Sequence, residues 1–535
     1  MLARLTEFTR RLSAWPGLVF ALVFAWKILL FGFSAQPVPA NDAFFYDGPV
    51  VNLLLHGKYV NPSLALAFPI SGTKVFCAYP PLYQLALLPW MAIFGTSALS
   101  AMAFHLVLFG IYMLVLFAVL RCLQAPVWCI HLAGAFLFLI TFHDRPDSLA
   151  HVFGISAIYA WVRNGSCPGA GVPPAAGASR PSSWPWAMVI AIVLALATSL
   201  QIGAIYWLLI WTAVLAESLF AHKRFPILPM AATIIVPLAL IFLVIYRYPQ
   251  LWAGFLEHAR QTPSFTGLRW PLVGEILKVI RTAPAVIAVA ILFPLSLCLN
   301  PNLNLNPNPT SSTQSYPALL TFAASLAALA VIAACLFVLT PNMVAIAGYL
   351  QPVILGSFLT FSITTMVKKS WKRALGALFI CLAILGSTRP IGMTTWGLAC
   401  AADFGYSTTI HRIRKELDST VEGQTVVLSS AYLYEAARQS NIRWIHSDWL
   451  HLLDRPRPSE SEALLRLKPA KLILTQFDFY RRYEPILDEL KSHPSEVKFQ
   501  IVQTANIPAP DSFSSLQKVV QHISWAPVIV TFTWP

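Results

Sequence analysis

The chain has few charged side chains, and its first 388 positions are especially poor in acidic ones. Of 535 residues, 57% are hydrophobic and 11% are charged, whereas soluble domains carry about 25% charged residues. This excludes a soluble protein and indicates a polytopic α-helical membrane protein. A carboxylate near lipid is unfavourable unless it is paired or hydrated, so each one requires either a solvated loop or a function. The acidic residues before Arg389 are Glu7, Asp42, Asp47, Asp144, Asp147, Glu217, Glu257 and Glu275.

Cysteine pairs with metal-binding or disulfide spacing are also lacking. The eight cysteines are scattered, without Cys-x-x-Cys or Cys/His spacing, which excludes a zinc site of that kind and a disulfide framework. The net charge is +14, but from Arg389 onward 16 basic residues face 15 acidic ones. The positive excess therefore belongs to the membrane part, where loop charge sets orientation and does not indicate nucleic acid binding.

Long apolar runs separated by polar stretches predict about 11 transmembrane helices. The first run exceeds the 7–15 apolar residues of a signal peptide core, so we expect it to be retained. The stretch 82–94 is short for a span of about 20 residues, and we expect it to lie at the interface. The expected spans are 15–35, 98–120, 127–142, 148–162, a helical hairpin within 184–216 turning near Gln201, 226–246, 283–299, 318–339, 343–366 and 374–388.

The basic residues orient these spans with the N-terminus in the cytoplasm. Arg10 and Arg11 precede the first span, and Arg121 and Arg163 end later ones, as the positive-inside rule requires of cytoplasmic ends. The outer loops are then 36–96, 143–147 and 247–282. Two of these loops hold paired carboxylates, so the topology predicts that they meet on one face.

The third outer loop departs from the charge rule. It contains five cations in 36 residues, which are Arg247, Arg260, Arg269, Lys278 and Arg281. Such cations suit a phosphate at headgroup level, either that of a lipid-linked substrate or that of anionic membrane lipid. The sequence leaves these two explanations open.

From about Asp403 the pattern changes to that of a soluble domain. Strands are expected at 425–429, 442–446, 471–475, 497–503 and 528–533, with helices at 433–439, 460–467 and 484–492. This alternation predicts a small α/β layer with a partly parallel sheet. We therefore divide the chain into a transmembrane catalytic module, 1–390, and an extracytoplasmic α/β domain, 391–535. The latter has no Gly-rich phosphate loop, which favours a structural or acceptor-facing cap over an independent catalytic domain.

Carboxylates beside cations on one face could catalyse group transfer from a phosphate. A carboxylate takes a proton from a hydroxyl nucleophile as general base, and Arg, Lys or a divalent metal stabilises the leaving phosphate. A divalent metal is one candidate cofactor, with Glu257 and His258 as candidate ligands. One Glu and one His is a weak signal, and a solvated loop histidine is the commoner case.

The order of three short motifs resembles that of the GT-C glycosyltransferases. An acidic motif, Asn41-Asp42, follows the first helix, Tyr79-Pro-Pro-Leu-Tyr83 leads to a short helix, and Arg145-Pro-Asp147 lies in the second outer loop. The nearest branches are the bacterial relatives of protein O-mannosyltransferases and of lipid A aminoarabinose transferases. The resemblance implies inverting transfer of a sugar from a polyprenyl-phosphate donor to an acceptor hydroxyl on the extracytoplasmic side.

Site residues follow from this resemblance by position. Asp42 would be the general base, and Asp147 with Arg145 the second-loop catalytic group. Asn41-Asp42 stands where many relatives have Asp-Glu, and Ala78-Tyr79 stands where the aminoarabinose branch has an acid and a lysine. The first departure leaves one carboxylate in the motif, and the second puts that branch's metal site and substrate in doubt. The candidate substrate-binding residues are Tyr46, Tyr79, Tyr83, Lys74, Arg260 and Arg269.

The expected location is the bacterial inner membrane, with the C-terminal domain periplasmic or extracellular. The expected partners are the polyprenyl-phosphate sugar, a lipid, glycan or protein acceptor, and membrane lipid, with no nucleic acid. Two other classes remain open: a transporter or flippase of lipid-linked or anionic solutes, and a non-catalytic envelope assembly protein. Transporters tend to show internal repeats and ionisable or broken helices at the bilayer midplane. This sequence shows no repeat, and its carboxylates fall at the ends of the expected spans.

Overall fold

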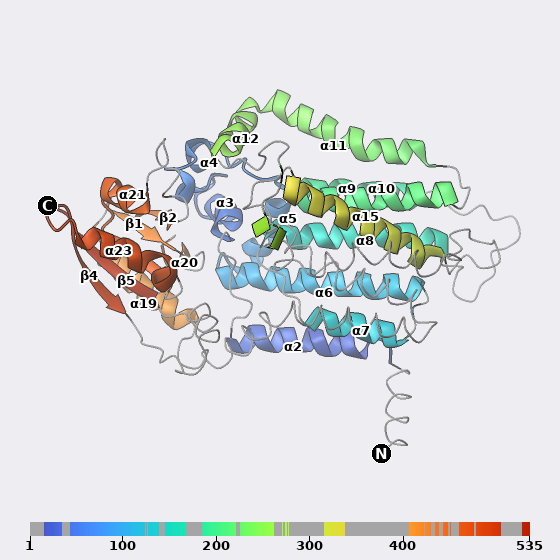
Figure 1. Ribbon diagram of the computed structural model, residues 1–535, viewed down its shortest axis with the longest axis horizontal. Coiled ribbons are helices and arrows are strands. Elements are labelled where there is room, and N and C mark those ends of the chain that lie inside the picture. Colours follow the sequence, from blue (N-terminus) through green and yellow to red (C-terminus); the bar gives the residue numbers. More distant parts are fainter. Residues whose placement is uncertain are drawn as a thin grey trace, which may run out of the picture.

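A bundle of long apolar helices forms most of the described structure (Figure 1). The computed structural model describes residues 15–34, 43–123, 125, 127–138, 145–166, 184–220, 225–261, 270, 273–274, 276–277, 315–337, 406–421, 423–429, 434–437, 442–447, 450, 459–475, 478–503 and 527–535. The bundle helices are α2 (Leu18–Ser34), α6 (Ala98–Cys122), α7 (Val127–Phe138), α8 (Pro146–Ser166), α9 (Trp184–Thr198), α10 (Leu200–Phe220), α11 (Ile227–Arg247) and α15 (Ser315–Phe337). Each matches an expected apolar run.

Three of the described helices are long and apolar enough to cross a membrane. They are Ala98–Cys122, Leu200–Leu219 and Ile227–Arg247. The spans expected at 283–299, 343–366 and 374–388 lie outside the described residues. The expected hairpin is confirmed: α9 and α10 pack against each other and are separated by Ser199 alone, two residues before the expected turn.

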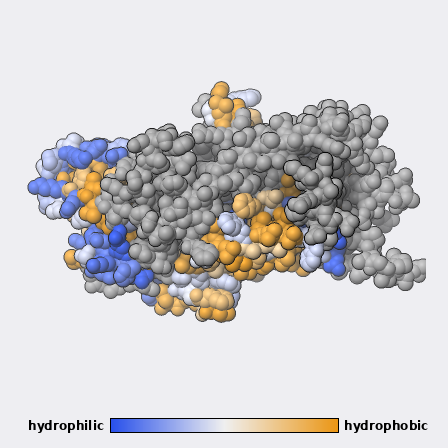
Figure 2. Space-filling model, turned by 90° about the horizontal axis from the view of Figure 1, so that it is seen from below, coloured by the Kyte–Doolittle hydropathy of each residue, from blue (hydrophilic) through white to orange (hydrophobic). Residues whose placement is uncertain are grey.

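The helices of the bundle differ in how far their apolar side chains are buried, as expected for helices in lipid. Helix α8 packs between α6 and α9, and its Trp161 is buried. The Trp161 indole donates a hydrogen bond of 2.8 Å to Glu217 Oε2, so this carboxylate in the bundle is partnered. On α11, by contrast, large apolar side chains such as Phe242 are 72% exposed. Figure 2 shows hydrophobic residues over the middle of the molecule, where the helices lie, and hydrophilic ones at the end that holds the C-terminal domain.

The first outer loop is more helical than expected. It contains α3 (Ala43–His56), the 3-10 turn η1 (Pro62–Leu64), α4 (Pro69–Thr73) and α5 (Leu82–Phe94). The sequence Asp47-Gly48-Pro49 predicts a turn, but α3 runs through it. Pro49 has no N–H and leaves the carbonyl of Phe45 without its helical donor. Asn61 Nδ2 lies 2.9 Å from Phe44 O and 3.4 Å from Phe45 O and supplies the missing donor.

Helix α12 (Pro249–Gln261) begins the third outer loop and packs on α4. A Cβ atom at Gly254 would lie 2.0 Å from Cys77 Sγ and 3.0 Å from Ile70 Cγ2. The absence of a side chain at Gly254 therefore allows this close packing. The third predicted outer loop therefore packs against the first one, as expected for loops on the same side of the membrane.

The C-terminal domain is an α/β layer with a mixed five-stranded sheet. The strands are β1 (Thr425–Leu428), β2 (Arg443–His446), β3 (Lys471–Thr475), β4 (Lys498–Gln503) and β5 (Pro527–Thr533), in the order β2-β1-β3-β5-β4. The first three are parallel, and β5 is antiparallel to β3 and β4. The expected, partly parallel sheet is therefore confirmed. The domain boundary expected at 390/391 lies outside the described residues.

Helices cover both faces of this sheet. Val426 and Leu428 share a core with α19 (Tyr406–Asp418) and α20 (Tyr434–Ala437), while Val427 lies in the opposite core. That core is completed by α21 (Glu460–Leu467), the π-helix η7 (Phe479–Tyr483) and α23 (Glu484–Lys491). The alternation along β1 explains its uninterrupted apolar sequence, because both faces of the strand are buried. Helices α19 and η7 were not expected from the sequence pattern.

The C-terminal domain lies at the end of the bundle that carries α3, α4 and α12 (Figure 1). Leu66 of the first loop packs against one of its cores, and Ala98 at the start of α6 belongs to the other. Phe44 stacks on His446 with ring centroids 4.7 Å apart. The predicted outer loops and the α/β domain therefore lie together at one end of the helices.

Candidate active site

An ion pair at the start of α8 is the centre of the candidate site. Arg145 Nε lies 3.2 Å from Asp147 Oδ2, and both side chains are 13% exposed. The other carboxylate oxygen, Asp147 Oδ1, accepts a hydrogen bond of 2.9 Å from Ser199 Oγ. Ser199 is the residue between α9 and α10, so the hairpin turn holds the second outer loop in place.

Tyr46 connects this ion pair to α3. Arg145 Nη2 donates to Tyr46 Oη over 3.3 Å, and the guanidinium lies 5.5 Å from the centre of the Tyr46 ring. Tyr46 is 2% exposed, and its ring meets that of Tyr79 edge-on at 4.8 Å. The structure thus brings together four of the predicted site residues, Tyr46, Tyr79, Arg145 and Asp147, from two outer loops.

A second polar chain lies beneath this cluster. Tyr83 Oη donates to Asp47 Oδ1 over 2.9 Å and lies 2.9 Å from His105 Nε2. Because the phenol has one proton, His105 Nε2 must be the donor in the second bond. Asp47 and Tyr83 are fully buried. Tyr83, a candidate substrate-binding residue, joins α3, α5 and α6 through these two bonds.

The remaining predicted residues occupy different positions. Asp42 and Arg269 lie outside the described residues, although Asp42 immediately precedes α3. Lys74, beside α4, and Arg260, on α12, are exposed. Helices α4 and α12 lie at the same end of the bundle as α3 (Figure 1).

Glu257 and His258, the candidate metal ligands, both contact residues of the first predicted outer loop. Glu257 Oε2 accepts from the backbone N–H of Ile70 over 3.2 Å, and burial raises the pKa of its carboxyl despite that bond and the charge of Lys74. The His258 ring lies against Phe45 and Phe68, and burial lowers its pKa to about 4. The part of the chain that the structure describes contains no group of three or more His, Cys, Asp or Glu that could hold a metal. Metal binding by Glu257 and His258 stays a prediction.

Two residues of the site were not selected from the sequence. Asp47 was noted only as a neighbour of Asp42, and Ser199 was treated as part of an apolar hairpin. The one available signal for Ser199 was a polar residue in the middle of the long apolar run 184–216.

Comparisons with known proteins give similarity in structure only. No family model and no curated protein matches the sequence. ArnT from Cupriavidus metallidurans, in a crystal structure bound to undecaprenyl phosphate, is similar over 98% of both chains, with 14% identity and a TM-score of 0.46. Archaeal oligosaccharyltransferase AglB from Archaeoglobus fulgidus, in complex with an inhibitory peptide and a dolichol-phosphate, is similar over 95% of this chain and 77% of its own, with 10% identity and a TM-score of 0.48. At these TM-scores the similarity supports no further conclusion.

Proposed function

We propose that this protein is a membrane glycosyltransferase of the GT-C class. It moves a sugar from a polyprenyl-phosphate donor to an acceptor hydroxyl on the extracytoplasmic face, with inversion at the anomeric carbon. The proposal rests on the three loop motifs of the sequence and on the positions of their residues in the fold.

The observation that carries the proposal is the meeting of Arg145, Asp147 and Tyr46 at one end of the bundle. The ion pair is nearly buried, and two separate segments hold it through Tyr46 and Ser199. A preorganised polar site needs side chains that are held in this way. Groups that are already in position do not have to rearrange during the reaction, and the reaction barrier is lower as a result. Tyr46 follows Asp42 by four residues, so the helix that begins directly after the proposed base also holds the ion pair.

The reaction is a single in-line displacement. Asp42 takes the proton of the acceptor hydroxyl, whose oxygen forms a bond to the anomeric carbon. The bond from that carbon to the phosphate oxygen breaks, and its electron pair leaves with the polyprenyl phosphate. Arg145 and Asp147 organise the site, and the cations Arg260 and Arg269 hold the lipid phosphate at headgroup level. No step is assigned to a metal.

Replacing Asp42 by Asn tests the proposed base. Asn keeps the size of the side chain but cannot accept the proton, and a general base contributes about 100- to 10,000-fold to rate. We expect Asp42→Asn to lose transfer at least 100-fold while the yield of folded protein is unchanged. Release of polyprenyl phosphate from its sugar conjugates in purified membranes measures the transfer.

The matched control is Asp488→Asn, which removes a carboxylate that is 59% exposed in the C-terminal domain and should leave transfer intact. Full activity of the Asp42→Asn protein would remove Asp42 from the mechanism. Movement of the lipid-linked sugar across the membrane without transfer would instead favour the transporter.

A further inference from the structure

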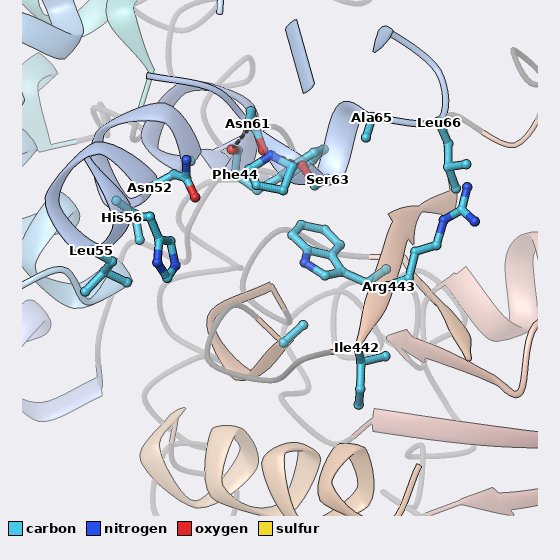
Figure 3. A pocket seen from close by; sticks show the side chains of 15 residues that line it. Phe44, Asn52, Leu55, His56, Asn61, Ser63, Ala65, Leu66, Ile442 and Arg443 are labelled. Carbon is cyan, nitrogen blue, oxygen red and sulfur yellow. Dashed lines mark hydrogen bonds between the residues drawn. The ribbon is translucent and has the colours of Figure 1, made fainter. Parts of the chain in front are cut away.

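A pocket lies between α3 and the C-terminal domain. It has a volume of about 310 Å³, within the range of small-molecule sites, which starts at about 300 Å³. Figure 3 shows Asn52, Leu55 and His56 of α3 on one side, and Ile442 and Arg443 of the C-terminal domain on the other. Neither part of the chain forms this pocket alone.

Two aromatic residues give the pocket a firm apolar wall. Phe44 and Trp444 both line it, and their rings meet edge-on with centroids 5.7 Å apart. Phe44 is buried and also stacks on His446, so a second aromatic contact fixes the position of the Phe44 ring. The half-buried Trp444 presents a rigid aromatic surface, and the electron-rich ring face suits the polarised C–H groups of a sugar ring.

The polar groups of the pocket include both donors and acceptors. Asn52 Nδ2 donates to the Lys58 carbonyl over 2.8 Å, which leaves its Oδ1 to accept from a ligand hydroxyl. The side chain of His56 is exposed and makes no hydrogen bond to another described residue. Arg443 is exposed at the opposite side. A small set of polar groups around an apolar wall is the usual composition of a ligand site.

The charge of the pocket favours an anionic ligand. Among the described residues that line it, Arg443 is the one cation and none is acidic. A guanidinium binds carboxylate and phosphate in a fixed fork geometry, which makes it selective for such groups. A carboxylate or phosphate on the ligand would therefore lie toward β2, with the hydroxyl groups toward α3.

We propose that this pocket binds an anionic saccharide, one that carries a carboxylate or phosphate, as a unit of the acceptor. The acceptor role rests on the proposed glycosyl transfer. Helix α3 joins the two sites: Tyr46 and Asp47 pack toward α5 and Arg145, whereas Phe44, Gly48 and Asn52 line the pocket. Phe44 follows Asp42 by two residues, so a sugar against this wall lies next to the segment that carries the base.

Binding to the full-length protein, without any donor, tests the pocket. Saturation-transfer NMR in detergent would compare digalacturonate with neutral galactobiose. We expect digalacturonate to bind and galactobiose to bind at least tenfold more weakly. Arg443→Gln should weaken digalacturonate binding by about tenfold or more, and Trp444→Ala should abolish the binding of both sugars. Arg466→Gln, an exposed arginine on α21 outside the pocket, should bind like the unaltered protein.

The outcomes separate this proposal from the proposed reaction. Asp42→Asn should lose transfer yet bind digalacturonate normally, because the probe needs no chemistry. Absence of digalacturonate binding to folded protein would overturn the pocket assignment and leave the transfer reaction standing. Binding that Arg443→Gln leaves unchanged would also overturn it, as would displacement of the sugar by an acidic peptide that pairs with the edge strand β2.

Discussion

The ion pair Arg145–Asp147 shows how strongly one side chain can depend on distant partners. Asp147 accepts from Arg145 on one oxygen and from Ser199, which is 52 residues later, on the other. Both bonds end on the charged carboxylate, and such a hydrogen bond contributes about 1.5–3 kcal/mol. Only the bond to Arg145 also pairs two opposite charges, because Ser199 is a neutral donor. The two partners of Asp147 should therefore differ in importance, and this difference can be measured.

Substitutions at Asp147 and Ser199 should have graded effects on transfer. Asp147→Asn leaves the guanidinium of Arg145 without its charge partner and lets it move. A misplacement of about 1 Å can reduce a rate by about 100-fold, and we expect a loss of that size. Ser199→Ala removes one neutral donor and leaves the ion pair with Arg145 in place, so the loss should be smaller, about tenfold or less. Equal losses in the two variants, measured by transfer in membranes at matched protein levels, would contradict this account.

Tyr83, a predicted contact with substrate, makes its described contacts within the protein. Its motif, Pro80-Pro81-Leu82-Tyr83, begins α5 as the sequence indicates, but the side chain is fully buried. The phenol joins Asp47 of α3 to His105 of α6. Tyr83 therefore acts on the site by fixing the helix that follows Asp42.

Among the elements, α12 has the most specific packing requirement. It lies on α4 through Gly254, whose Cα approaches Cys77 and Ile70 too closely for a side chain. The same helix carries Arg260, which we propose to hold the lipid phosphate. Its position should therefore affect use of the donor even though it lies apart from the ion pair.

A valine at position 254 should detach α12. Overpacking costs about 1–3 kcal/mol, and here the collision involves the short, branched or partly buried side chains of Cys77 and Ile70. We expect Gly254→Val to increase hydrogen exchange over 249–261 and to lower transfer. Ala253→Val is the matched control, because Ala253 is exposed on the same helix. An unchanged exchange rate in Gly254→Val would show that α12 and α4 are not packed in this way.

The packing of α12 should also weaken in acid. Burial lowers the pKa of His258 from 6.5 to about 4, so between these values the unfolded segment binds a proton that the folded one does not. Stability contributed by His258 is complete above pH 6.5 and is lost as the pH falls toward 4. Hydrogen exchange of 249–261, corrected for intrinsic rates, should rise between pH 7 and pH 5.

His258→Phe provides the comparison. Phenylalanine fills the space between Phe45 and Phe68 without titrating, so the dependence on pH should be smaller. The same dependence in both proteins would assign it to another group.

In the whole molecule, the outer loops and the C-terminal domain share one end of the helical bundle. This arrangement follows from the alternating direction of the helices, since α3, the start of α8, the α9–α10 turn and α12 all lie there (Figure 1). The basic residues Arg121 and Arg163 lie at the other ends of their helices. The domain therefore covers the end on which the candidate site lies.

The orientation in the membrane can be checked with fusion proteins. A reporter enzyme that is active only outside the cytoplasm should be active when fused after Pro535 and inactive when fused after Arg121. The physical reason is the excess of cations at the Arg121 end, which retains that end in the cytoplasm. The reverse pattern would invert the topology and place the candidate site inside the cell.

Local patterns in the sequence predicted the helices of the bundle and the strands of the C-terminal domain. Apolar length and period depend on near neighbours, and for α5, α21 and β3 the expected bounds agree with the structure. The motif Arg145-Pro-Asp147 indicated the ion pair for the same reason. Three other features depend on contacts between residues far apart in the chain.

Helix α3 continues through Gly48-Pro49 because Asn61 supplies a donor from outside it. The hydrogen bond from Ser199 orients the carboxylate of Asp147. The pocket is formed by residues of α3 and β2 together. Sequence patterns report which residues favour a helix, a strand or a loop. They do not report which distant side chain will satisfy a buried carbonyl or carboxylate, because that depends on how the helices pack.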